Sequence, residues 1–258
     1  MDAFFAAMGS FLQSIGFNTL FWIGMVFFVV INIFIVAGWF GYTILPMEGF
    51  KIARFSQSWG TKALAIAALA GAAKVVLQFA SSPLVLVPGV ITFRLDNLVA
   101  TAMGLIAGPA AVWGLVIGNV IGDTISGTLN LGSIGGALAN WFGNFLVFVL
   151  VTDPFMRKGR NYWEYAVYII ALTIGVDFYL CTFFQMINLM PTEVVWTGVF
   201  PSILVGVPPS IILMPLLVRF LAPLMDRWNL MAADIGFKWL SGPRVDSGAK
   251  NGVSQTGS

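Results

Sequence analysis

The chain has 258 residues, of which 59% are hydrophobic and only 9% are charged, whereas a soluble domain carries roughly 25% charged residues. A soluble fold of this composition would expose large apolar patches and aggregate, so the sequence indicates an all-α integral membrane protein. The net charge of +2 is too small to indicate a nucleic-acid partner. The absence of histidine and the single cysteine, Cys181, exclude His-ligated haem, His-based metal sites and an internal disulfide, and we expect no metal or cofactor.

Apolar runs of about 20 residues mark the expected membrane spans. Residues 1–17 carry apolar side chains at helical spacing, and we expect this segment to lie in the membrane interface. The first span is then predicted at residues 18–45. Six further runs follow, at residues 63–80, 95–107, 110–128, 133–151, 162–186 and 196–221.

Prolines and glycines end one of these runs and interrupt another. Residues 95–107 are short for a full crossing and end at Gly108-Pro109, which stops a helix. Pro208-Pro209 and Pro215 are expected to kink the last run. A second interfacial helix is predicted at residues 225–240, and the Gly/Ser/Asn-rich residues 241–258 are predicted to be disordered.

Basic residues in the short loops predict the orientation by the positive-inside rule. They gather after the first span, between residues 153 and 161, and after the last span, whereas residues 1–17 and 191–195 contain none. Seven crossings with the N-terminus outside and the C-terminus in the cytoplasm of a cell-membrane protein place all three basic segments inside.

Ionisable side chains within spans are costly, and each is a functional hypothesis. Five of them qualify as candidates, and in the predicted orientation these five lie near mid-depth or in the outer half: Lys74, Arg94, Asp96, Asp123 and Asp177. This one-sidedness predicts a polar cavity that opens outward. Pairing among these charges as structural ion pairs is the alternative.

Amides accompany the charges. Asn119 and Asp123 are four residues apart, so they share one helix face, and Asn140 with Asn144 forms a second polar strip. Amide side chains donate and accept hydrogen bonds, which suits a polar heterocycle but also suits helix–helix bonding.

Small residues at four-residue spacing predict close helix packing. Gly114, Gly118 and Gly122 form a glycine ladder that we assign to internal packing. The helix at 63–80 carries only small side chains on two adjoining faces, its smooth faces, which suggests that one of them meets another protein. These faces consist of Ala63, Ala67 and Gly71, and of Ala68 and Ala72.

Residues 61–224 resemble the substrate-binding (S) components of energy-coupling factor transporters. The resemblance rests on the alanine-rich helix at 62–78, on Ile91-Thr92-Phe93-Arg94-Leu95-Asp96, on Gly108-Pro109-Ala110, and on the pairs Gly118-Asn119 and Gly122-Asp123. In this order they are similar to the queuosine-precursor branch of the family.

The resemblance implies a six-helix core that captures a vitamin-like solute from outside and docks on a membrane T component driven by two cytoplasmic ATPases. Small residues of the first core helix would contact the T component through one of the two smooth faces. The span at 18–45 is an addition to this core, and it could occupy the docking surface.

Other functions remain open at this point. A stand-alone secondary transporter would suit the broken helices, and a structural subunit of a larger complex would suit the additional span. An intramembrane aspartyl protease is disfavoured because Val120-Ile121-Gly122-Asp123 lacks one of the glycines of its motif, so we expect no enzyme. We hypothesise that Arg94 and Asp123 bind solute, with Lys74, Asp96, Asn119, Asn140 and Asp177 around them.

Overall fold

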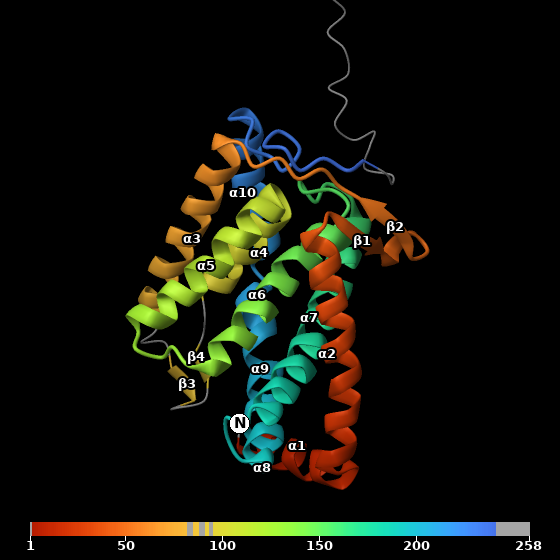
Figure 1. Ribbon diagram of the computed structural model, residues 1–258, viewed down its shortest axis with the longest axis vertical. Coiled ribbons are helices and arrows are strands. Elements are labelled where there is room, and N and C mark those ends of the chain that lie inside the picture. The colour runs from red at the N-terminus through yellow and green to blue at the C-terminus, as the bar shows by residue number, and fades with distance from the viewer. Residues whose placement is uncertain (1, 82–84, 88–90, 93–94, 241–258) are drawn as a thin grey trace, which may run out of the picture.

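The structure, a computed structural model, describes residues 2–81, 85–87, 91–92 and 95–240. This part of the chain is a helical bundle with a short β-hairpin at each end (Figure 1). In chain order the elements are α1 (Asp2–Ile15), α2 (Phe17–Trp39), β1 (Tyr42–Leu45), η1 (Pro46–Glu48), β2 (Lys51–Arg54), α3 (Thr61–Ser81), β3 (Val85–Val87), β4 (Ile91–Thr92), α4 (Leu95–Ala107), α5 (Pro109–Ile125), α6 (Leu131–Leu150), α7 (Gly159–Met186), α8 (Thr192–Val194), η2 (Val195–Val199), α9 (Phe200–Ile211) and α10 (Met214–Arg227).

The predicted all-α architecture is confirmed in its main part, because the described residues are mostly helical. Within the described residues, four helices are long and apolar enough to cross a membrane, by length and composition: Phe17–Trp39, Thr61–Ala80, Leu131–Leu150 and Gly159–Met186. The other predicted runs form shorter helices, which include α4 and α5.

The two N-terminal helices pack against α7 and its continuation. α1 lies across one end of the bundle (Figure 1), where Leu12 is buried in a cluster with Leu20 and Trp196. α2 runs along α7, and Phe27 stacks on Phe178 with ring centroids 5.0 Å apart. α2 and α3 therefore lie on opposite sides of the bundle (Figure 1).

The first membrane-spanning helix was predicted at residues 18–45, and the prediction of its C-terminal end was wrong. α2 ends at Trp39, and Gly41 has a φ of 79°, a left-handed conformation that glycine adopts without strain. Tyr42–Leu45 is strand β1 and pairs antiparallel with β2. Hydropathy alone did not separate this strand from the helix because aromatic and β-branched side chains are apolar and also favour strands.

α3 and α5 approach each other at backbone distance. A Cβ atom on Gly114 would lie 1.9 Å from the carbonyl oxygen of Ala67, and one on Gly118 would lie 2.5 Å from that of Gly71. These glycines are therefore required for the contact, and their predicted packing role is confirmed.

The last predicted run, residues 196–221, is divided between η2, α9 and α10. Pro215 has no N–H group, so the Ile211 carbonyl lacks the donor that a continuous helix would supply. The hydroxyl of Tyr165 on α7 donates to this carbonyl oxygen instead. The break between α9 and α10 is thus held by a neighbouring helix.

The interfacial helix predicted at residues 225–240 is also wrong. α10 ends at Arg227, and the following residues form turns that close one end of the bundle. Ala232 N donates to the Ile106 carbonyl at 3.0 Å, and Phe237 is buried. Met231, Ile235 and Phe237 are therefore buried inside the protein, whereas Trp228 and Leu240 stay exposed. The helical spacing of these apolar residues did not correspond to a helix.

Candidate functional site

A cavity of about 680 Å³ lies between α4, α5, α6, α7 and α9. At one end its lining includes Thr128, Asn130 and Leu189, which lie in the connections at the end of the bundle that carries α8 and the β3–β4 hairpin (Figure 1). The opposite end of the bundle is filled by packed aromatic side chains, including Phe145, Phe148 and Trp239.

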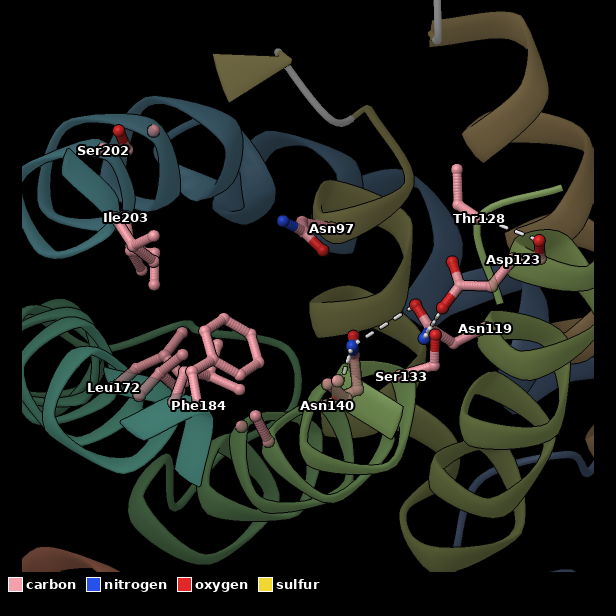
Figure 2. Close-up of a pocket in the computed structure, with 18 of the residues that line it drawn as sticks. Asn97, Asn119, Asp123, Thr128, Ser133, Asn140, Leu172, Phe184, Ser202 and Ile203 are labelled. Atoms are coloured by element: carbon pink, nitrogen blue, oxygen red, sulfur yellow. Dashed lines mark hydrogen bonds between the residues drawn. The ribbon is translucent and has the colours of Figure 1, made fainter. Parts of the chain in front are cut away.

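The two sides of the cavity differ in chemistry, as Figure 2 shows. One side is polar and comes from α4, α5 and α6, with Asn97, Thr101, Asn119, Asp123, Ser133, Asn140 and Asn144. The facing side is mainly apolar and comes from α7, η2 and α9, with Leu172, Val176, Leu180, Phe184, Val199 and Ile203. Such a cavity suits a ligand that is polar along one edge and apolar over its body.

Hydrogen bonds join the polar side into one chain. Asn119 Nδ2 donates to Asp123 Oδ2 at 3.4 Å, and Asn140 Nδ2 donates to Asn119 Oδ1 at 3.4 Å. Asn140 Oδ1 in turn accepts from Lys74 Nζ at 3.1 Å. Asp123, Asn119 and Asn140 can be followed in Figure 2. The chain links α5 to α6 and then to α3.

A buried ion pair supports this polar side. Lys74 Nζ lies 2.5 Å from Asp96 Oδ2, and both side chains have no exposed surface. Lys74 also donates to Asn97 Oδ1 at 3.4 Å. A buried charge with several partners is tolerated inside a protein. Because Lys74 bonds both Asn97 and Asn140, it holds two of the amides that line the cavity in place.

Asp123 is held from the α3 side as well. Gln78 Nε2 donates to Asp123 Oδ1 at 3.0 Å. The main-chain carbonyl of Asp123 accepts hydrogen bonds from the hydroxyl and the backbone N–H of Thr128. The carboxylate is only partly buried. Asp123 is the carboxylate among the described residues that line the cavity, so it favours a ligand with a cationic or hydrogen-bond-donating group.

The structure brings together most, but not all, of the predicted site residues. Asn119, Asp123 and Asn140 line the cavity, and Lys74 and Asp96 lie directly behind the polar side. Asp177 is fully buried on α7 and does not line the cavity. Arg94 lies outside the described residues, so its role stays a prediction.

Several lining residues were not selected from the sequence. Asn97 and Thr101 share one face of α4 at four-residue spacing, and Tyr168 donates or accepts a hydrogen bond with Thr101 at 3.4 Å. The spacing on α4 was a usable signal. Ser202 on α9 was not predictable, because a single serine in an apolar run usually bonds its own helix, as Ser202 does to the Gly198 carbonyl at 2.6 Å.

The two smooth faces of α3 have different surroundings. Ala63 and Gly71 are buried, and Ala67 packs against Gly114 of α5. This burial excludes that face as a docking surface. Ala68 and Ala72 are exposed, so the second predicted face is the one accessible to a partner.

The cavity holds amide, hydroxyl and carboxylate groups, which bind through hydrogen bonds. Among the residues that the structure describes, no three His, Cys, Asp or Glu side chains come together. Comparison with protein-family models, curated proteins and solved structures found no match.

Proposed function

We propose that this protein is the substrate-capture subunit of an ATP-driven importer, an S component that holds a small polar solute in the cavity. The observation that carries the proposal is the division of the cavity into an amide-rich side with Asp123 and a facing apolar side with Phe184. A flat polar heterocycle fits both sides, because its edge can bond the amides while its faces contact apolar groups.

The proposed orientation opens the cavity to the outside. Lys62 lies in the first turn of α3, Arg157 lies between α6 and α7, and Arg227 ends α10, and these three points lie at the end of the bundle opposite the cavity mouth (Figure 1). The positive-inside rule assigns that end to the cytoplasm. We therefore propose seven crossings, in which α2 is added to a six-helix core.

The proposed partners are a membrane T component and two cytoplasmic ATPase subunits. The sequence has no Walker A motif, so ATP-driven import would draw its energy from such partners. Ala68 and Ala72 on the exposed face of α3 form the proposed docking surface. Because α2 lies on the other side of the bundle (Figure 1), it leaves this face uncovered.

Ligand binding without ATP tests the capture role. The chain would be purified in lipid nanodiscs, its co-purified solute identified by mass spectrometry, and binding titrated, with a queuosine precursor as the first compound. Asp123→Asn and Asn119→Ala are expected to weaken binding at least tenfold, since each removes a bond worth about 1.5–3 kcal/mol to a charged or buried group.

The matched control is Asp226→Asn, which removes an exposed carboxylate near the end of α10 and should leave affinity unchanged. Equal affinity of the wild-type chain and both cavity variants would refute the site. Solute uptake into vesicles that contain this chain alone would instead identify a secondary transporter.

A further inference from the structure

The β1–β2 hairpin presents an apolar outer face. Ile44 lies opposite Ile52 in the antiparallel register, and Tyr42 lies opposite Arg54. Ile44 is 45% exposed and Ile52 75% exposed, whereas Thr43, on the inner face, is buried. Since the inner face already packs on the bundle, the outer face is left exposed at the surface of the protein.

The tip of the hairpin adds a further apolar group. Phe50 is 74% exposed and has a φ of 58°. A bulky residue rarely adopts this left-handed conformation, and such strain commonly marks a functional site. The strained backbone therefore accompanies an aromatic ring that projects away from the protein.

With α2 as a membrane span, the hairpin lies at the depth of the membrane surface. α2 has 23 residues, about 35 Å at 1.5 Å per residue, which just exceeds a hydrocarbon core of about 30 Å. Tyr42 follows three residues after the helix ends, and Trp39 and Phe40 are exposed beside it. Aromatic side chains at such a position are typical of the membrane–water interface.

The charges of the hairpin complement acidic lipid. Lys51 and Arg54 are exposed on β2, and the Arg54 guanidinium lies 5.4 Å from the centre of the Tyr42 ring. Residues 42–62 contain three basic residues and one acidic residue, Glu48. Lysine and arginine beside apolar groups bind phospholipid phosphates through charge and hydrogen bonds.

We propose that the β1–β2 hairpin is a lipid-binding element that inserts Ile44, Phe50 and Ile52 into the membrane interface and binds acidic phospholipid headgroups through Lys51 and Arg54. The proposal rests on the membrane assignment and not on the cavity, so it holds or fails independently of solute capture. The hairpin would fix the end of α2 at the headgroup layer and thereby set the tilt of the bundle in the bilayer.

Insertion is tested with a fluorescent probe on Ile52→Cys in the full chain, reconstituted in nanodiscs with brominated lipids. The native Cys181 is buried and stays unlabelled. The control is Lys158→Cys, an exposed position in the connection between α6 and α7. We expect lipid quenching to be several-fold stronger at position 52. Equal quenching at the two positions, or quenching at 52 by aqueous iodide only, would overturn the insertion.

Headgroup preference is tested with nanodiscs that mix phosphatidylcholine and phosphatidylglycerol, by measuring the lipid that stays bound after mild detergent extraction. Lys51→Gln/Arg54→Gln is expected to lower the phosphatidylglycerol enrichment by roughly fivefold per basic residue. Arg157→Gln/Lys158→Gln removes the same charge from the α6–α7 connection. An equal loss in this control pair, or no loss in the hairpin pair, would overturn the headgroup site.

Discussion

Lys74 and Asp96 form an ion pair without solvent contact, with Nζ and Oδ2 2.5 Å apart. Lys74 comes from the second half of α3, and Asp96 from the first turn of α4. The pair therefore joins two helices at the level of the cavity. Because Lys74 also bonds Asn97 and Asn140, this single contact affects both stability and the arrangement of the polar side.

Replacing one member of this ion pair should lower the free energy of unfolding more than replacing both members with apolar residues. Asp96→Asn or Lys74→Met alone is expected to lower the free energy of unfolding by about 3 kcal/mol or more, because one buried charge loses its partner. Lys74→Met/Asp96→Leu should recover much of that loss. Unfolding in detergent, followed by circular dichroism, measures all three variants. Additive losses in the double variant would contradict the buried-pair interpretation.

The contact between α3 and α5 should not tolerate a side chain on its glycines. Gly114→Val is expected to prevent stable folding, since even a Cβ atom would overlap the Ala67 carbonyl. Gly136→Ala on α6 is the control, because nothing lies within 4 Å of its Cβ position, and a helical Gly→Ala change stabilises by up to about 1 kcal/mol. Thermal stability in detergent distinguishes the two. A Gly114→Val chain as stable as wild type would contradict the observed packing.

Filling the cavity should abolish solute binding without unfolding the chain. Gly136 lines the cavity and has free space at its Cβ, so Gly136→Phe is expected to place a ring where the ligand binds. Gly136→Ala should bind almost normally. Titration with the identified solute measures binding, and melting temperature confirms the fold. Undiminished binding by Gly136→Phe would place the ligand elsewhere.

Partner docking should depend on the exposed face of α3. Ala68→Trp/Ala72→Trp is expected to reduce co-purification with a T component at least tenfold while solute binding persists, since both positions face outward. Val29→Trp on α2, which is also exposed, serves as the control on the other side of the bundle. If only the α2 variant failed to co-purify with the T component, the interface would be assigned to α2 and the proposed α3 surface would be refuted.

The stability of the chain at the break between α9 and α10 should depend on the hydroxyl of Tyr165, which donates to the Ile211 carbonyl. Tyr165→Phe is expected to destabilise the chain by about 1–3 kcal/mol, the cost of a buried carbonyl left without a donor. Tyr162→Phe is the matched control, because Tyr162 is exposed and its hydroxyl accepts from Arg219. Its cost should stay below about 0.5 kcal/mol. Chemical unfolding measures both, and equal costs would contradict the role of the Ile211 carbonyl.

Helical periodicity in the sequence already placed Asn119 and Asp123 on one face, and the glycine spacing identified the close contact of α5. Both follow from the geometry of a single helix, which any chain of this pattern shares. The same reasoning failed at residues 42–45 and 228–240, where apolar side chains belong to a strand and to partly buried turns. Local hydropathy does not distinguish these from a helix, since burial depends on the rest of the fold.

The sequence by itself determined that the chain is mainly helical, that several of its helices are long and apolar enough to span a membrane, and that polar groups gather on particular helix faces. Only the tertiary structure decided which faces meet. It pairs Lys74 with Asp96 behind the cavity, packs Ala67 against Gly114 of α5, and leaves Asp177 away from the cavity lining. The physical reason is that periodicity fixes which residues share a face, whereas the neighbour of that face depends on how distant helices pack.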